Sequence, residues 1–176
     1  MKLSWSHKLF FKANRLIGRS AWFDRTVKFW AEYALFFLTV LVLLFLWLRC
    51  PGPANLMFIF VWLPLLWLLG FGISALIGYV WPHRRPIVEF PEIRELITPL
   101  SNWKSLPSDH AFSAWLLVAT VFLGPSCGPV AIWPAWIFAL LATIISMARV
   151  FAGVHYPRDI VVGTALAWVV ALVFFR

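Results

Sequence analysis

Charged residues are scarce in this chain of 176 residues: they make up 12% of it, and seven acidic residues face fifteen basic ones. Hydrophobic residues make up 62%, and the mean hydropathy is +0.87. No soluble domain of this length can bury that much apolar surface, so lipid must serve as part of the solvent. A polar linker is also missing, which favours one compact domain.

Cysteine is nearly absent, with Cys50 and Cys127 the only two. Each lies in a short turn between apolar runs, and we expect two small unpaired thiols rather than a disulfide. No Cys–His spacing typical of a metal site is present. No internal repeat is visible either, which argues against a transporter built from inverted repeats.

Long apolar runs dominate the rest of the chain, at about residues 30–49, 54–81, 110–124, 130–148 and 159–175. The first and fourth match the roughly 20 residues that a bilayer requires, and the second is long enough to tilt or bend. The third and fifth are shorter, which suits helices whose ends open into a polar pocket. The sequence therefore predicts an all-α membrane protein with a bundle of about five transmembrane helices over residues 30–176.

The segment of residues 1–29 mixes large apolar residues with seven Lys or Arg and one acid, Asp24. It is too charged to span a membrane, and it has no small-residue cleavage site of a signal peptide. We expect an amphipathic helix that lies on anionic headgroups at the interface. With five spans, this segment, the loop 82–107 and the residues after Arg149 all fall on the same side of the membrane.

Two short polar clusters flank the third apolar run on its N-terminal side. Arg84 and Arg85 precede a proline in the loop, and their planar donors suit the oxygens of phosphate. Ser108 is a good N-cap for the helix that follows Pro107, and the first free N–H groups of that helix form an anion site. His110, in the same turn, is placed to donate a proton to a leaving group.

The third cluster joins Arg149, His155 and Asp159. Near lipid, an Arg or Asp costs roughly 2.5 to 3.5 kcal/mol at a helix centre, so such a group is rarely kept without a purpose. Pro157 suits the first turn of the last helix, where the helix dipole favours an ionised Asp159. Four residues separate His155 from Asp159, close enough for the carboxylate to orient the imidazole as a nucleophile.

Each of these residues, taken alone, has an alternative interpretation that involves no function. An intramembrane His is usually a packed core residue, and an Arg at a helix end usually snorkels to the interface. Their coincidence at one side of the membrane favours a phosphate-handling site instead. A zinc site built from His110, His155 and Asp159 is disfavoured because nearby arginines would repel a dication.

The order Arg-Pro, Pro-Ser-x-His and Arg-x5-His-x3-Asp, from about residue 78 to 160, resembles the type-2 phosphatidic acid phosphatase superfamily of integral-membrane lipid phosphate phosphatases. The resemblance implies that His155 forms a phosphohistidine, that Asp159 orients it, and that His110 protonates the leaving oxygen. It also implies that no metal or other cofactor takes part. The phosphate clamp implied by the resemblance consists of Arg85, Ser108, Arg149 and the backbone N–H of Asp109.

Three positions depart from the family pattern. Gly78 stands where the first motif usually has a Lys, and Arg84 is our candidate for the missing charge. Asp109 replaces a common Gly, and Ala148 a common Ser. With Pro-Ser-Asp-His, the small size and the stretch Phe29-Trp-Ala-Glu-Tyr33, the chain looks most like bacterial undecaprenyl pyrophosphate phosphatases associated with bacitracin resistance.

This resemblance implies hydrolysis of undecaprenyl pyrophosphate to undecaprenyl phosphate, which recycles the lipid carrier for cell-wall synthesis. Alternatives with the same chemistry are phosphatidic acid, phosphatidylglycerol phosphate or the phosphate of a lipid A. A non-catalytic lipid-binding protein and a vanadate-dependent peroxidase are more distant alternatives. The expected partners are the lipid substrate and the bilayer, with no nucleic acid, and the sequence carries no indication of oligomeric state.

The family's active sites face away from the cytoplasm, which implies a multi-pass protein of the bacterial cytoplasmic membrane whose site and N-terminus face the periplasm or exterior. The seven basic residues before residue 29 conflict with this, because the positive-inside rule would keep them in the cytoplasm. We follow the family, because a basic interfacial helix also binds anionic lipid on the outer leaflet. A further crossing within residues 1–29 would remove the conflict, but the charge of that segment argues against it.

Overall fold

The computed structural model describes residues 3–99, 103–124 and 132–176, and within these ranges every regular element is a helix. In chain order the helices are α1 (Trp5–Asn14), α2 (Ala21–Glu32), α3 (Ala34–Arg49), α4 (Pro53–Met57), the π-helical turn η1 (Phe58–Trp62), α5 (Leu63–Val80), α6 (Pro86–Glu89), α7 (Asp109–Leu123), α8 (Ile132–Phe151) and α9 (Pro157–Phe174).

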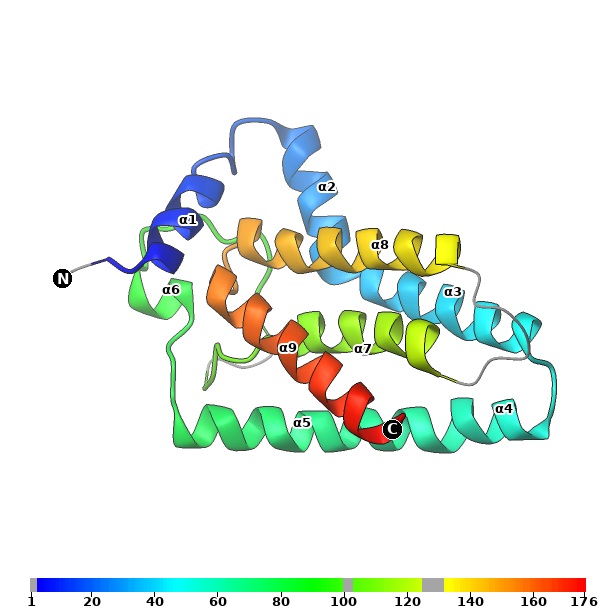
Figure 1. Cartoon of the computed structure of the whole chain (residues 1–176). Coiled ribbons are helices and arrows are strands. Elements are labelled where there is room, and N and C mark those ends of the chain that lie inside the picture. The colour runs from blue at the N-terminus through cyan, green and yellow to red at the C-terminus, as the bar shows by residue number, and fades with distance from the viewer. Residues whose placement is uncertain (1–2, 100–102, 125–131) are drawn as a thin grey trace.

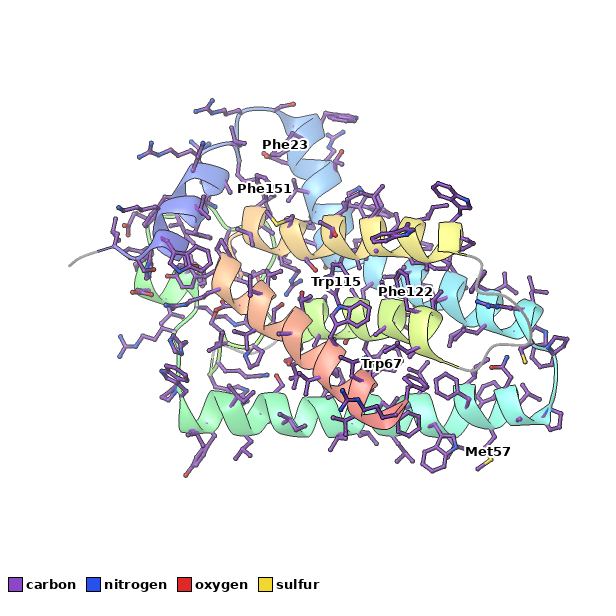
Figure 2. The ribbon with its side chains drawn as sticks, in the orientation of Figure 1. Phe23, Met57, Trp67, Trp115, Phe122 and Phe151 are labelled. Carbon is purple, nitrogen blue, oxygen red and sulfur yellow. The ribbon has the colours of Figure 1, made fainter. Side chains whose placement is uncertain are left out.

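Helix α7 forms the centre of the bundle, with α3, α5, α8 and α9 packed around it (Figure 1). Most of its residues from Ala111 to Val121 are buried, which explains why this helix is apolar on all sides. Helix α5 comes close to α7 at Gly70, where an added Cβ would lie 1.8 Å from the Phe112 ring. Figure 2 shows Trp67 of α5 with Trp115 and Phe122 of α7, whose rings pack against this core.

The outer surface of the bundle is apolar as well. Helix α5 alone exposes Leu68, Leu69 and Leu76 by more than half of their area. Among the described residues, three helices are long and apolar enough to cross a membrane, namely the continuous α4–α5 unit, α8 and α9, and the α2–α3 pair is a fourth candidate bent by 51°. The prediction of an all-α membrane protein is confirmed, while the number of five crossings stays a prediction because α7 has only 15 residues.

The N-terminal segment contains two helices where the sequence predicts one. Gly18 makes the turn between them with a positive φ of 78°, and its N–H donates to the Asp24 carboxylate at 3.0 Å. Ser20 then caps α2, which continues beyond residue 29 to Glu32. The location of this segment at a membrane interface stays a prediction.

Helix α1 is anchored to the bundle, against α8 and α9. Its buried Asn14 donates to the carbonyl of Arg94 at 2.7 Å and accepts from the Arg94 N–H at 3.2 Å. Its Ser6 hydroxyl accepts from the N–H of Arg158 at 3.1 Å, in the first turn of α9. These bonds join α1 to the connection between α6 and α7, which contains Arg94, and to the first turn of α9, which contains Asp159 of the third polar cluster.

The expectation of two unpaired thiols is wrong, because Cys50 is disulfide-bonded. Cys127 lies outside the described residues. Cys50 follows the C-terminal end of α3, at the far end of the bundle from α1 and α6 (Figure 1). Its distance from the polar clusters gives the disulfide no part in the candidate site.

The polar clusters meet at one end of the bundle, as the sequence predicts. The C-terminal end of α8 and the N-terminal ends of α7 and α9 lie together there, covered by α1 and α6 (Figure 1). Gly163 allows α9 to approach the start of α7, because an added Cβ would lie 2.6 Å from the Ser108 carbonyl oxygen. The N–H of Ser108 donates to the carbonyl of Asp159 at 3.1 Å across the same contact.

Candidate active site

A cavity of about 390 Å³ opens at this end of the bundle. Five of the predicted site residues line it, and they come from four parts of the chain: the α5–α6 connection, α7, α8 and the α8–α9 turn. The complete lining is Glu32, Arg85, Ile97, Thr98, Pro99, Trp103, Lys104, Asp109, His110, Arg149 and His155.

His155 lies in the turn between α8 and α9 and is 3% exposed. Gly153 begins this turn with φ of 87°, and a Cβ there would lie 2.8 Å from the carbonyl oxygen of Arg94. Pro157 occupies the first turn of α9, as predicted. The turn therefore holds the imidazole rigidly against the cavity.

Asp159 is fully buried behind His155. Its Oδ2 lies 3.5 Å from Nδ1 of His155 and accepts from the N–H of Tyr156 at 2.9 Å. The hydroxyl of Ser105 donates to the same oxygen at 2.5 Å. These donors fix the carboxylate, which in turn faces one nitrogen of the imidazole as the sequence predicts.

The guanidinium of Arg85 determines which nitrogen of His155 carries the proton. Its Nη1 lies 3.3 Å from Nε2 of His155 and also donates to the carbonyl of Val154 at 3.0 Å. A guanidinium can only donate, so Nε2 accepts and the proton of a neutral ring resides on Nδ1, opposite the Asp159 carboxylate. The lone pair of Nε2 therefore points toward a cation at the cavity.

Burial lowers the pKa of His155 to about 4, helped by the charge of Arg149, whereas the hydrogen bond to Asp159 acts in the opposite direction. The imidazole is thus neutral at pH 7. Burial also lowers the pKa of Arg85, while the carboxylates of Asp109, Asp159 and Glu95 raise it. An arginine remains a cation at neutral pH despite such a shift.

Arg149 enters the cavity from the last turn of α8. Its Nη1 donates to the carbonyl of Ala31 at 2.8 Å, at the C-terminal end of α2. The side chain is 6% exposed, so this backbone bond supports a guanidinium that is otherwise directed at the cavity. Glu32, the next residue of α2, adds a carboxylate to the lining.

The start of α7 supplies the remaining predicted residues. Ser108 caps the helix by accepting from the N–H of Ala111 at 3.5 Å, as predicted, and it is fully buried. Asp109 and His110 form the first turn and line the cavity. The positive end of the α7 dipole therefore faces the same space as Arg85 and Arg149.

Comparison with known proteins places this geometry in a family. Residues 79–176 match the model of the PAP2 superfamily, which is more than half of the chain. The chain belongs to the PAP2 superfamily. This assignment confirms the resemblance drawn from the three motifs.

Individual known proteins are similar to this chain over most of its length. The undecaprenyl-diphosphatase BcrC of Bacillus subtilis (strain 168) is 28% identical over 97% of this chain and 83% of its own length. The bacitracin transport permease protein BcrC of Bacillus licheniformis is 28% identical over 85% of this chain and 68% of its own. The crystal structure of Aquifex aeolicus LpxE, at 20% identity, covers 98% of this chain and 95% of its own with a TM-score of 0.71, so the fold shared with that structure includes the N-terminal helices.

One predicted residue lies away from this PAP2 site. Arg84 is exposed and does not line the cavity, although its neighbour Arg85 does. Its role in phosphate binding stays a prediction that the lining does not support. The backbone at Arg85 is extended, with φ of −70° and ψ of 155°, and successive side chains of an extended chain point to opposite sides.

The sequence did not predict several residues of the site, among them Ser105, Lys104 and Glu32. Ser105 and Lys104 lie just before the Pro-Ser-Asp-His motif, and Glu32 lies in the stretch from Phe29 to Tyr33. Proximity to a motif was the available signal for Ser105 and Lys104. Within the described residues, no group of three or more His, Cys, Asp or Glu is arranged to hold a metal ion.

Proposed function

We propose that this chain is a membrane phosphatase that removes the terminal phosphate of undecaprenyl pyrophosphate through a phosphohistidine at His155, without a metal. The observation that carries the proposal is the approach of Arg85 Nη1 to His155 Nε2, at 3.3 Å. It supports an unprotonated nucleophile beside a cation in a cavity that also holds His110 and Arg149. The names of the relatives support the choice of lipid.

In the first step, Nε2 of His155 attacks the terminal phosphorus, and the bond from phosphorus to the bridging oxygen breaks. Arg85 and Arg149 neutralise charge on the transferring phosphoryl group, which is the main contribution a protein makes to phosphoryl transfer. Asp159 stabilises the positive charge that the ring acquires. His110, which lines the same cavity, gives its proton to the departing oxygen of undecaprenyl phosphate.

In the second step, water attacks the phosphorus of the phosphohistidine. His110, now without its proton, accepts a proton from that water, so the acid of the first step is the base of the second. The bond between phosphorus and Nε2 breaks, inorganic phosphate leaves, and both histidines return to their starting states. The net reaction consumes one water and yields undecaprenyl phosphate and phosphate.

The proposed site faces the periplasm or exterior from the cytoplasmic membrane. The resemblance to family members with outward-facing sites supports this orientation, and a lipid carrier released after cell-wall assembly would be met there. Residues 1–29 would then lie on the outer leaflet as an interfacial segment, before the phosphatase domain of residues 30–176.

Phosphate release from undecaprenyl pyrophosphate by the purified protein, in detergent with excess EDTA, tests the proposal. Release should persist in EDTA and fall by at least about 10,000-fold in His155→Ala, since loss of a nucleophile removes the covalent route. His83→Ala is the matched control, because His83 lies outside the cavity lining. Substantial turnover by folded His155→Ala would refute the role of His155, and loss of activity in EDTA would refute the metal-free mechanism.

The choice of lipid is tested separately, in the same assay. Phosphatidic acid, phosphatidylglycerol phosphate and a lipid A phosphate compete with undecaprenyl pyrophosphate, and we expect the pyrophosphate to have the highest kcat/KM. Preference for one of the monoesters would keep the chemistry and overturn the substrate. If the wild-type protein releases phosphate from none of the four lipids, a non-catalytic lipid-binding protein is favoured.

A further inference from the structure

Lys104 is a buried cation that the mechanism above does not use. It lies in the loop between α6 and α7, is 7% exposed, and lines the cavity with Arg85 and Arg149. Its Nζ donates to the hydroxyl of Ser74 at 2.5 Å and to Oδ1 of Asp109 at 2.8 Å. A buried ammonium is costly to desolvate, and these two acceptors hold it in one place.

The ammonium keeps a donor for a ligand. It has three N–H bonds, of which Ser74 and Asp109 engage two. The ring centroid of Trp103, which also lines the cavity, lies 5.6 Å from Nζ, and on this side the third N–H can donate to an oxygen bound in the cavity. Because Asp109 is the first residue of α7, the charge of Lys104 is held at the positive end of that helix, where anions bind.

Gly78 makes this arrangement possible. It is buried on α5, and an added Cβ would lie 2.8 Å from Cδ and 3.1 Å from Cβ of Lys104. These atoms belong to the stem of the lysine and not to its flexible end, so any side chain at position 78 would displace Lys104. The stem of Lys104 therefore occupies the space above the position where the family motif usually has its own Lys.

The departures at positions 78 and 109 thus belong to one arrangement. Removing the side chain at 78 admits a lysine from the α6–α7 loop, and the carboxylate at 109 fixes its ammonium. Ser74, one helical turn before Gly78 on α5, accepts from the same ammonium and itself donates to Oδ1 of Asp109 at 2.6 Å. A lone carboxylate facing a phosphate site would repel the ligand, and the pairing with Lys104 offsets that repulsion.

We infer that Lys104 is a third cation of the phosphate site, which contacts a phosphate oxygen of the substrate from the place that a lysine at position 78 would occupy. Ser74 and Asp109 are positioning residues that act through Lys104. The inference rests on the proposed phosphatase activity and adds a substrate-binding residue to it. Arg84 is then not needed as the replacement for the missing charge.

The test replaces Lys104 by Met, which keeps a stem of similar length and removes the charge. We expect kcat/KM for undecaprenyl pyrophosphate to fall about 100-fold, as for loss of one donor to a transition-state oxyanion. Inorganic phosphate should inhibit the variant about tenfold more weakly than the wild type, because a charged hydrogen bond is lost. Lys28→Met, at an exposed lysine of α2, is the matched control and should leave both values unchanged.

Moving the lysine from position 104 to position 78 tests whether the two positions serve the same phosphate site. Lys104→Ala should lose activity to a similar extent, and Gly78→Lys combined with Lys104→Ala should recover at least about tenfold of it. The combination of Lys104→Met with Asp109→Asn distinguishes a lysine that binds phosphate from one that only neutralises the carboxylate of Asp109. It should stay impaired, because removing the repelling carboxylate does not restore the donor. Unfolding temperature in detergent identifies any variant whose fold has changed.

Several results would overturn the inference. Folded Lys104→Met with wild-type kcat/KM would exclude a role in the reaction, and a loss of activity with unchanged phosphate inhibition would assign Lys104 a structural role. Recovery of activity on adding Asp109→Asn would show that Lys104 only neutralises the carboxylate of Asp109. If Gly78→Lys with Lys104→Ala recovers no activity, a lysine at position 78 does not replace Lys104, and the inferred equivalence of the two positions is wrong. A wild-type protein inactive on every lipid phosphate would instead refute the proposed function itself, a separate outcome.

Discussion

At the scale of single residues, the environment of His155 decides what the site can do. Its Nε2 faces Arg85 and its Nδ1 faces Asp159, and burial keeps the ring neutral. A neutral imidazole with an acceptor nitrogen at a cation-lined cavity suits the proposed role of nucleophile, because it needs no deprotonation before an attack. The spacing of four residues between His155 and Asp159 predicted this pair because both lie in one helix-initiating turn.

The ionisation of His155 gives a direct prediction. Because burial lowers its pKa to about 4, the ring should stay neutral as the pH falls from 8 to 5, whereas an ordinary histidine gains its proton near 6.5. NMR of ring-labelled histidine in detergent micelles should show the neutral-form shift of His155 across this range, with His155→Gln used for assignment.

A variant of the carboxylate checks the cause. Asp159 raises the pKa of His155, so Asp159→Asn should move the midpoint lower still, and a burial effect without this pair would leave it in place. A wild-type midpoint near 6.5 would contradict the buried, neutral nucleophile.

Other residues of the site were beyond sequence reasoning, for a physical reason. Positions 78 and 104 are 26 residues apart and meet only because α5 and the α6–α7 loop pack together, so neither the glycine nor the lysine signals the other. A charge in a loop usually indicates a solvated side chain. Arg84 shows the converse, since adjacency to Arg85 suggested a shared role but the backbone directs the two side chains differently.

At the scale of helices, the hydropathy of the sequence located the helices of the bundle, but it did not reveal that the N-terminal segment forms two helices or that α1 packs against the bundle. The apolar run at residues 110–124 differs from α7 by one residue at each end, because Ser108 and the apolar core define it locally. The division of the first segment at Gly18 was missed, since hydropathy is insensitive to a turn between two amphipathic helices. The anchoring of α1 depends on Asn14 and a backbone 80 residues away, which no local pattern contains.

The contact between α7 and α9 yields a prediction at this scale. Gly163→Ala would place a Cβ 2.6 Å from the Ser108 carbonyl oxygen, so the two helices must separate close to His110 and His155, which both line the cavity. We expect a loss of about 1 to 3 kcal/mol in stability from overpacking. Activity should fall on the order of 100-fold, as for a misplacement of about 1 Å.

Gly72→Ala is the control for this variant. Gly72 also lies within a helix, α5, but an added Cβ meets nothing within 4 Å. It should keep full activity and be slightly more stable, because Ala has the higher helix propensity. Thermal unfolding followed by circular dichroism, together with phosphate release, measures both variants. Equal unfolding temperatures for the two would show that α7 and α9 do not need a glycine at their contact.

At the scale of the whole molecule, the bundle separates two chemically different ends. One end holds the cavity and the helices α1 and α6, and the other holds the C-terminal end of α3, which Cys50 follows, and the start of α4 (Figure 1). Large apolar side chains cover the helices between them, which leaves the bilayer as their solvent. In the proposed function the substrate headgroup enters at the cavity end, whereas the direction of that end across the membrane is a separate property.

The orientation is open to a direct measurement, and our proposal places the site outside. In a background with Cys50 and Cys127 replaced by Ala, Leu3→Cys at the site end should react with an impermeant thiol reagent in intact cells, and Gly52→Cys at the far end should be protected. Leu3 is 41% exposed, and Gly52 has open space beside it, so both positions are accessible in the protein.

Two features oppose the expected result: the basic residues before residue 29, and a disulfide at an end that would face the reducing cytoplasm. The reversed labelling pattern would reconcile both, and it would require a lipid phosphate presented on the inner leaflet as the substrate of the same chemistry.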